Sequence, residues 1–307
     1  MGSIQTIDLH KWYGKRHILR GLSFEAKSNQ VTLLAGRNGV GKTTWLRLAL
    51  GLGYPSKGSV LYDEKTIDKV REQVAIVCDE PPVYPHLSGG ENLKLLSSIR
   101  RPDKKWTSYI KEILNLEPNF LTLRAGEYSL GQRRRLAIAA AMLRKPKYLF
   151  LDEPTVGLDP VAWSMVKQSL KSLASNDTAI ILTGQDFNEL EKLIDSIVIL
   201  RNGMVAFDGD VPQLLRRRPP RVRVSTNDMN IIMSRFPQAK VNMDSGFPTA
   251  EIDCSSLQEA EDLVATIQKF DIKLQGLSIY NDSLAEAFLA IEGIEAFVSK
   301  GDAYESN

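Results

Sequence analysis

The chain has 307 residues, enough for two domains of ordinary size. It is 43% hydrophobic and 25% charged, which is typical of a globular protein with a sizeable core. Its 39 Lys and Arg against 37 Asp and Glu give a net charge of +2. This balance does not support a protein whose whole surface binds nucleic acid, although it does not exclude a local basic patch. Cys78 and Cys254 form no CxxC pair, which argues against a disulfide scaffold or a zinc ribbon and favours a reducing compartment.

No segment of the sequence is expected to enter a membrane. The N-terminal residues contain no apolar stretch of the kind found in secretion signals. No apolar run approaches the roughly 18 residues that a helix needs to cross a bilayer. We therefore expect a chain that does not cross a membrane by itself.

Residues 1–215 are predicted to form an α/β domain. Short apolar runs, several of them β-branched, read as buried strands between helix-like stretches. This alternation predicts a mainly parallel sheet covered on both faces. The beginning differs, because Ile4–Leu9 and Leu22–Ala26 flank a turn-like segment and predict an antiparallel β edge. The five expected strands of the main sheet are Val31–Ala35, Val74–Val77, Tyr148–Leu151, Ala179–Leu182 and Ile197–Leu200.

A basic, proline-containing linker is predicted at residues 216–220. Three arginines precede Pro219 and Pro220, and two prolines cannot continue a helix. Like charges crowded together favour an exposed connector. Two interpretations of this basic run stay open, a solvated linker and a contact with anionic lipid headgroups.

Residues 221–295 are predicted to form a small α+β accessory domain. Its apolar pattern switches between the strand and helix periods in the order β-α-β-β-α-β, which is typical of a ferredoxin-like sandwich. A terminal helix is expected at Asp282–Ile291, and residues 296–307 are expected to be a flexible tail. The successive elements are Arg221–Thr226, Asp228–Arg235, Ala239–Met243, Ala250–Cys254, Leu257–Phe270 and Ile272–Ile279.

A phosphate-binding loop is the clearest motif in the chain. Residues 36–43, GRNGVGKT, fit G-x-x-x-x-G-K-[ST] between a predicted strand and the helical run Thr44–Leu50. Glycines let backbone N–H groups turn toward phosphate oxygens, and the helix N-terminus adds partial positive charge. Lys42 would contact the β- and γ-phosphates, and the Thr43 hydroxyl would ligate Mg²⁺. The expected nucleotide-binding residues here are Arg37, Asn38, Gly39, Val40, Gly41, Lys42, Thr43 and Thr44.

Two adjacent carboxylates end the apolar strand Tyr148–Leu151. Strand alternation points Asp152 and Glu153 to opposite sides unless the chain bends there, so they should have different roles. We expect Asp152 to hold the hydration shell of Mg²⁺ and Glu153 to orient or deprotonate the attacking water. Beside a phosphate-binding loop we favour this interpretation over a simple turn.

Over roughly residues 3–215 these motifs resemble the ATP-binding-cassette (ABC) ATPases. Residues 128–132, YSLGQ, resemble the family signature, usually LSGGQ, at the start of the helical run Arg133–Leu143. Val156–Asp159 resembles the family's D-loop, with Asp159 at its end, and Tyr13 matches the aromatic residue that stacks on adenine. The resemblance implies a P-loop cassette with an antiparallel β edge and a helical subdomain at about residues 85–145. It also implies ATP and Mg²⁺ as cofactors.

The signature also has a physical basis. A helix that starts at Ser129, Leu130 and Gly131 presents N–H groups and a hydroxyl, which make a second anion-binding surface. One chain already has its own phosphate loop, so this donor set needs a nucleotide elsewhere. The resemblance implies a head-to-tail dimer in which Ser129, Leu130, Gly131 and Gln132 contact ATP bound to the partner cassette. Whether the partner is identical or different stays open.

Two positions depart from the family pattern. The Q-loop glutamine aligns with Asp79, and the switch histidine aligns with Gln185. An aspartate can still ligate Mg²⁺ but adds negative charge near the γ-phosphate, so the expected metal ligands are Thr43, Asp79 and Asp152, partly through water. A glutamine amide donates a hydrogen bond but cannot become cationic. We therefore expect hydrolysis through Glu153, Gln185 and Asp79 to be slow rather than absent.

A membrane role is implied by the resemblance alone. In transporter cassettes the segment that follows the Q-loop position receives a permease, and here that segment is roughly Asp79–Tyr109. A single cassette with a small C-terminal domain resembles the ABC-2-type exporters. The implied partners are an integral membrane permease and a second cassette, with no specific nucleic acid, on the cytoplasmic face of the cell membrane. Three roles of the C-terminal domain stay open: it regulates the dimer, stabilises the dimer or is a packing appendage.

Two other classes of function are weighed against the transporter. A soluble ABC ATPase that acts on ribosomes or DNA is disfavoured, because the chain shows neither a second cassette nor a long coiled coil. A nucleotide sensor that does not hydrolyse ATP is favoured only by Asp79 and Gln185. The transporter subunit is therefore the preferred hypothesis.

A few further residues are assigned to packing or local structure. Trp45 and Trp163 are expected to pack in the core or an interface, and Cys78 is expected to be a buried thiol at a strand end. Residues 88–91, SGGE, resemble a signature superficially but are expected to begin a helix.

Overall fold

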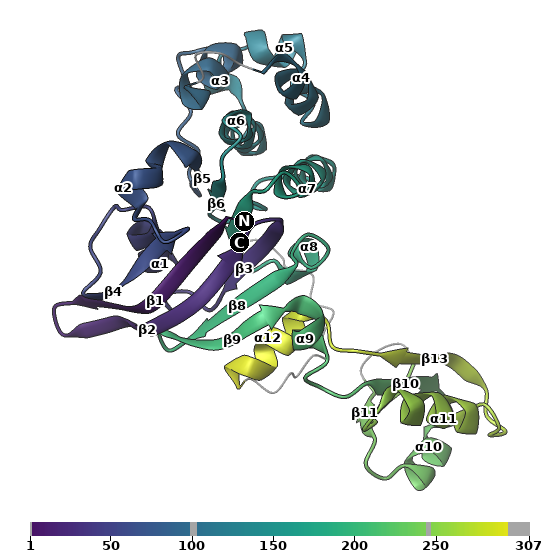
Figure 1. Ribbon diagram of the computed structural model, residues 1–307. Helices are drawn as coiled ribbons and strands as arrows, with labels where there is room; N and C mark the ends of the chain where they lie inside the picture. Colours follow the sequence, from purple (N-terminus) through teal and green to yellow (C-terminus); the bar gives the residue numbers. More distant parts are fainter. Residues whose placement is uncertain (1, 99–102, 244–246, 294–307) are drawn as a thin grey trace. The chain divides into compact units, whose positions relative to one another are not determined.

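The computed structural model describes residues 2–98, 103–243 and 247–293. These residues fall into two compact units, divided between Val211 and Pro212 (Figure 1). The division lies shortly before residue 215, where the sequence places the end of the first domain. The tail predicted at 296–307 lies outside the described residues.

The first unit is built on a six-stranded sheet with the order β5-β6-β7-β3-β8-β9. Its first five strands are parallel, and β9 runs antiparallel to β8. Every residue of β6 and β7 is buried, which is typical of parallel strands covered on both faces. The predicted parallel sheet is therefore confirmed. Its strands are β3 (Gln30–Ala35), β5 (Val74–Val77), β6 (Tyr148–Leu151), β7 (Ala179–Thr183), β8 (Ser196–Arg201) and β9 (Met204–Asp210).

A separate antiparallel sheet with the order β2-β1-β4 forms the predicted β edge. Its strands are β1 (Ser3–Tyr13), β2 (Arg16–Lys27) and β4 (Lys57–Tyr62). Helix α1 (Lys42–Ala49) buries Trp45, Leu46 and Leu48 in one apolar core that includes side chains of both sheets. The helix that follows the phosphate loop is thus fixed against both sheets.

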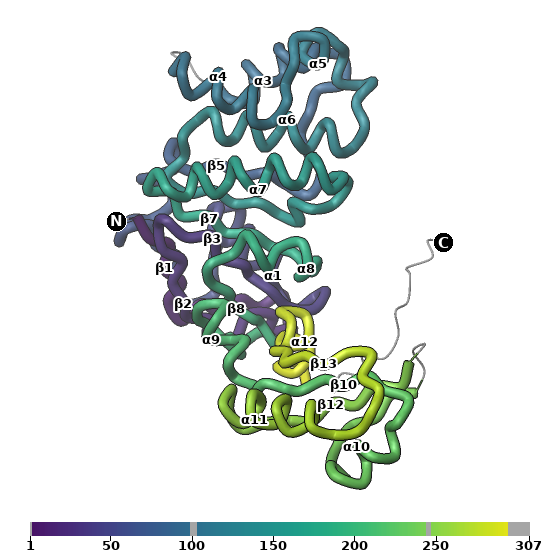
Figure 2. The backbone as a smooth tube through the Cα atoms, turned by 90° about the vertical axis from the view of Figure 1, so that its right-hand side faces the viewer, coloured from purple at the N-terminus to yellow at the C-terminus, as the bar shows by residue number. Residues whose placement is uncertain are grey.

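Four helices gather at one end of the first unit, as Figure 2 shows. Helix α3 begins with a capping box, because the Ser88 hydroxyl accepts from the N–H of Glu91 and the Glu91 carboxylate accepts from the N–H of Ser88. The predicted helix start at residues 88–91 is therefore confirmed. The four helices are α3 (Gly89–Ser97), α4 (Lys104–Ile113), α5 (Pro118–Thr122) and α6 (Leu130–Leu143); the first unit also contains α2 (Ile67–Val70), α7 (Pro160–Ala174) and α8 (Phe187–Leu190).

The second unit contains a four-stranded sheet with the order β11-β12-β10-β13 and antiparallel neighbours throughout. Its chain order is β-α-β-β-α-β, so the predicted ferredoxin-like arrangement is confirmed. Val222 and Val224 on one face of the sheet pack with Ile232 and Ile267 from the helices. The elements are β10 (Arg221–Thr226), α10 (Met229–Arg235), β11 (Lys240–Asn242), β12 (Thr249–Asp253), α11 (Leu257–Ile267), β13 (Leu274–Tyr280) and α12 (Leu284–Glu292), with α9 (Val211–Leu215) at the division.

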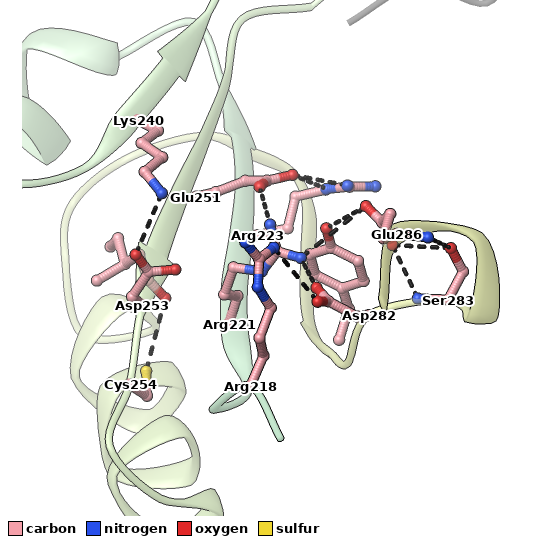
Figure 3. A network of polar contacts seen from close by, with 12 residues as sticks. Arg218, Arg221, Arg223, Lys240, Glu251, Asp253, Cys254, Asp282, Ser283 and Glu286 are labelled. Atoms are coloured by element: carbon pink, nitrogen blue, oxygen red, sulfur yellow. Dashed lines mark hydrogen bonds and ion pairs between the residues drawn. The ribbon is translucent and has the colours of Figure 1, made fainter. Parts of the chain in front are cut away.

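A charged network stabilises the other face of this sheet (Figure 3). Arg221 donates to the carboxylates of Asp282 and Glu251, and the Arg218 guanidinium lies 3.4 Å from Asp282. The Asp282 side chain is only 1% exposed. Arg218, inside the predicted linker, is therefore tied to the folded unit, so the basic run is not uniformly solvated.

The replacement Asp282→Ala is expected to destabilise the second unit by about 2–4 kcal/mol, because it removes the buried carboxylate that Arg218 and Arg221 share. Hydrogen exchange of Arg221–Thr226 measures this loss. The matched control is Asp253→Ala, whose ion pair with Lys240 is exposed and is worth less than about 1 kcal/mol. Equal exchange in the two variants would contradict the assignment of Asp282 as the centre of the network.

Two expectations about single residues are decided by burial. Trp45 and Trp163 are 0% and 2% exposed, which confirms them as packing residues. The prediction of a buried Cys78 is wrong: the residue is exposed, because β5 ends at Val77 and the chain leaves the sheet there.

Among the described helices, none combines the length and apolar character needed to span a bilayer.

Candidate nucleotide-binding site

The phosphate loop joins β3 to α1 and is shaped by three glycines with positive φ. The values are 151° at Gly36, 79° at Gly39 and 121° at Gly41. A Cβ at Gly36 would lie 2.8 Å from the carbonyl of Leu200, and one at Gly41 would lie 2.6 Å from Leu19, so both close approaches require glycine. Helix α1 begins directly after Gly41, so the N–H groups of its first turn are available to an anion.

Lys42 is buried inside this loop. Its ammonium group donates to the carbonyl of Gly36 at 2.6 Å and to that of Arg37 at 3.4 Å. Burial lowers the pKa of the Lys42 ammonium, while the nearby carboxylates of Glu153 and Asp152 oppose this shift. The loop thus holds a cation beside the acidic strand end.

The other predicted loop residues form its accessible side. Arg37, Asn38, Gly39 and Thr43 are exposed, and Val40 and Thr44 are half-buried. The N–H of Val40 donates to the carbonyl of Arg37 at 3.2 Å, which closes the loop as a tight turn. The Thr43 hydroxyl stands in the first turn of α1, the position expected for a ligand of a phosphate-bound metal ion.

The chain bends between the two acidic residues. Glu153 has φ 47°, in the left-handed region that costs a non-glycine residue about 1–2 kcal/mol. Because the chain bends here, the alternation of side chains along β6 does not continue past Asp152. The carboxylates of Asp152 and Glu153 are therefore close enough to interact. Burial raises the pKa of the Glu153 carboxyl; the Lys42 ammonium opposes this, and the Asp152 and Asp79 carboxylates add to it. A raised pKa makes Glu153 a stronger base than an ordinary glutamate.

Thr183, which is not among the residues predicted from the sequence, holds this bend. Its hydroxyl donates to the Asp152 carboxylate and accepts from the backbone N–H of Glu153 at 3.1 Å. Thr183 is the last residue of β7, the neighbour of β6 in the sheet. The carboxyl ends of parallel strands meet at one edge, so its position just before Gly184 was a usable signal.

Arg134 is a second site residue that is not among those predicted from the sequence. It lies on α6 with 1% of its side chain exposed, and it reaches both the acidic pair and the Q-loop position. It donates to the backbone carbonyls of Asp152, Glu153 and Asp79, and to the Asp79 carboxylate at 3.1 Å. The added negative charge expected from Asp79 is therefore partly compensated within the chain.

Gln185 contacts the phosphate loop. Its side-chain amide donates to the side-chain carbonyl of Asn38, and both residues are exposed. This contact joins the segment after β7 to the rim of the loop. The switch position therefore lies beside the predicted site of the γ-phosphate.

The signature residues open α6 through a capping box. The Ser129 hydroxyl accepts from the N–H of Gln132 at 3.2 Å, and the Gln132 side chain accepts from the N–H of Ser129 at 2.9 Å. A Cβ at Gly131 would lie 2.3 Å from the carbonyl of Gly157, so the turn packs closely on the predicted D-loop. Leu130 is 47% exposed at the same turn. The signature is thus a rigid helix start at the surface of the unit.

Asp159 and Tyr13 complete the predicted residues. The Asp159 carboxylate caps α7 by accepting from the N–H of Ala162 at 2.7 Å, which is a structural role at the end of the predicted D-loop. Tyr13, at the end of β1, is 51% exposed, and the Lys11 ammonium lies 5.1 Å from its ring centroid. Its ring is therefore available for stacking on a base.

The residues present fit a magnesium nucleotide. The glycine loop, the start of α1 and Lys42 supply the positive groups that phosphates require. Thr43 offers a hydroxyl and Asp152 a carboxylate, the hard oxygen ligands that Mg²⁺ prefers together with phosphate oxygens. Together with the acidic bend and the capped signature helix, these groups define a nucleotide-binding cassette of the P-loop class.

Comparison with known proteins identifies the family. Residues 19–156 match the family model described as ABC transporter. The bacitracin transport ATP-binding protein BcrA of Enterococcus faecalis is 30% identical over 234 residues, covering 74% of this chain and 76% of the relative. The daunorubicin resistance ATP-binding protein DrrA3 of Streptomyces coeruleorubidus is 27% identical over 94% of this chain and 95% of its own length.

A solved structure of the ATP-binding subunit of an ABC transporter has a similar fold. It aligns with a TM-score of 0.63 and 25% identity over 70% of this chain and 92% of the solved chain. The chain therefore belongs to the ABC transporter family, as one of its ATP-binding subunits. It binds ATP and is an ATPase.

Proposed function

We propose that this chain drives an ABC-2-type exporter, in which two copies of the chain close head to tail on ATP and act on a separate membrane permease. The names of its relatives support export, because they include bacitracin transport, lantibiotic transport and daunorubicin resistance proteins. The similarity to the daunorubicin resistance protein also extends over the second unit. The proposal places the chain at the cytoplasmic face of the cell membrane.

The observation that carries the proposal is the signature turn. Ser129 opens α6 at the surface, and the first N–H groups of that helix form an anion-binding surface separate in sequence from the phosphate loop. If this turn closes on the nucleotide of a second copy, the phosphate loop and the signature turn both contact phosphate groups. Each dimer then holds two nucleotides between Lys42 of one copy and Ser129 of the other.

Within each site the residues divide the chemistry. Lys42 and the loop amides hold the phosphates, and Tyr13 stacks on the base. Thr43, Asp152 and Asp79 would hold Mg²⁺, partly through water, and the ion would supply positive charge that neutralises the phosphates. Glu153 accepts the proton of the attacking water. Gln185 donates one hydrogen bond to the phosphate group.

Hydrolysis is proposed to be slow because Gln185 stands where the family has a histidine. The replacement Gln185→His is expected to raise the ATPase rate about tenfold, since an imidazolium adds positive charge where negative charge develops. Steady-state phosphate release measures the change. The control Gln185→Asn retains an amide and should not exceed the wild-type rate. An unchanged rate in Gln185→His would remove Gln185 as the cause of slow turnover.

The proposed permease-docking segment is residues 79–98 and 103–109. Its exposed part, which includes Pro82, Tyr84 and Pro85, is held in shape by Asn92, which is 0% exposed. Asn92 accepts from the N–H of Tyr84 at 2.7 Å and donates to the carbonyls of Tyr84, Leu87 and Ser88. A fixed, partly apolar loop of this kind suits docking to another protein.

Co-purification in mild detergent tests the transporter proposal. We expect the tagged chain to retain an integral membrane protein, and Tyr84→Asp to release it while the ATPase of the isolated chain is retained. A chain recovered wholly on ribosomes or DNA would contradict the proposal. A chain that binds ATP without any single-turnover hydrolysis would instead support a nucleotide sensor, the alternative that Asp79 and Gln185 favour.

A further inference from the structure

The side chain of Arg134 is buried, so its charge destabilises the fold unless its N–H donors are hydrogen-bonded. Its side chain is 1% exposed, and burying a guanidinium is costly without hydrogen-bond partners. Both terminal nitrogens point at the site described above: Nη1 reaches the carbonyls of Asp152 and Glu153, and Nη2 reaches the carbonyl and carboxylate of Asp79. Its Nε has no partner among the described residues. The terminal N–H donors of Arg134 therefore all point to the edge of the sheet where Asp152, Glu153 and Asp79 lie.

These partners come from different parts of the chain. Asp152 and Glu153 follow β6, whereas Asp79 follows β5, and Arg134 itself lies in the second turn of α6. One side chain thus joins the helix that Ser129 opens to the ends of two neighbouring strands. The guanidinium presents five N–H donors in a fixed planar fork, whereas the ammonium of a lysine has three donors on a flexible stem and cannot reproduce that geometry.

The contact with Glu153 has a specific consequence. The backbone of Glu153 is held in the left-handed region, its N–H by Thr183 and its carbonyl by Arg134. With both backbone groups fixed, the direction of the Glu153 side chain depends on where Arg134 lies. The position of Arg134 in turn depends on the start of α6.

We propose that Arg134 is a positioning residue that couples the signature helix to Glu153 and Asp79. When the signature turn closes on a nucleotide, α6 sets Arg134, and Arg134 sets the carboxylate that activates water. The inference rests on the proposed function, because only closure on a nucleotide gives this link a role in turnover.

The test compares kcat and KM for ATP in Arg134→Gln and Arg134→Lys of the full chain. Arg134→Gln is expected to lower kcat 10- to 100-fold and to leave KM for ATP within threefold, because the phosphate loop is untouched. Arg134→Lys, which keeps the charge but not the fork, should recover part of kcat. The control Arg144→Gln removes the same charge from the exposed end of α6 and should match the wild type.

A second measurement addresses the pairing with Asp79. In a double-mutant cycle of Arg134→Gln with Asp79→Asn, the combined loss in kcat should be at least threefold smaller than the product of the single losses. Losses that multiply would overturn the coupling between these two side chains.

The outcomes separate this inference from the proposed function. A wild-type chain that fails to hydrolyse ATP contradicts the proposed function itself. A wild-type chain that turns over while Arg134→Gln keeps kcat within twofold overturns only the role of Arg134. A loss confined to KM does the same, since it shows a contribution to binding alone. If Arg134→Gln does not fold, full kcat in Arg134→Lys overturns the need for the fork.

Discussion

Glu153→Gln is expected to lower the ATPase rate by about 10²- to 10⁴-fold, the usual contribution of a general base, while ATP still binds. The amide is nearly isosteric with the carboxylate, so the contacts of the Glu153 backbone with Thr183 and Arg134 are retained. Only the proton acceptor is lost. Single-turnover hydrolysis and ATP binding, measured on the same preparation, separate the two effects.

A matched control lies nearby. Glu80 is exposed and next to Asp79, so Glu80→Gln removes one negative charge close to the site without touching the proposed base. Its rate should stay within twofold of the wild type. A rate for Glu153→Gln similar to that of Glu80→Gln would remove Glu153 from the chemistry.

Lys42→Ala is expected to weaken ATP binding by about 10- to 100-fold, the equivalent of losing one charge-assisted hydrogen bond worth about 1.5–3 kcal/mol. Hydrolysis should fall further, by about 10²- to 10³-fold, since the same donor stabilises charge that develops during reaction. The Lys42 ammonium lies inside the loop, where it donates to the carbonyls of Gly36 and Arg37. Calorimetric titration with magnesium ATP measures the affinity.

Lys145→Ala serves as the control for Lys42→Ala. Lys145 pairs with Asp103 at 2.7 Å on the surface of the same unit, so its removal changes the charge of the cassette by the same amount. ATP affinity should be unchanged in this variant. Equal affinities in Lys42→Ala and the wild type would refute the assignment of the phosphate loop.

Much of the fold was predictable because the signals are local. The buried strands are continuous apolar runs, and the capping boxes at Ser88 and Ser129 fall within four consecutive residues. The β-α-β-β-α-β order of the second unit could be predicted from the places where the spacing of apolar residues changes between the strand period and the helix period. The spacing of the glycines predicted the phosphate loop, and the two acidic residues after an apolar strand predicted the base. Both motifs are contiguous in sequence.

The contacts that hold the site together were not predictable in the same way. Arg134 is one of three consecutive arginines on α6, and only tertiary packing shows which of them is buried against Asp79 and Glu153. Asp282 and its two arginines lie far apart in sequence, so the charged run at 216–221 gave no indication of its partner. Long-range polar pairing is set by the fold rather than by neighbouring residues.

Sedimentation velocity of Glu153→Gln with and without magnesium ATP shows whether two copies of the chain enclose the nucleotide. We expect monomers without ATP and dimers with it. Adding Ser129→Asp is expected to abolish the dimer, because the carboxylate repels phosphate. Ser129→Asn, which has the size of aspartate without its charge and is also a good helix cap, should retain the dimer. A protein that binds ATP and stays monomeric, or dimers that persist with Ser129→Asp, would show that the signature turn does not close on the nucleotide of a second copy.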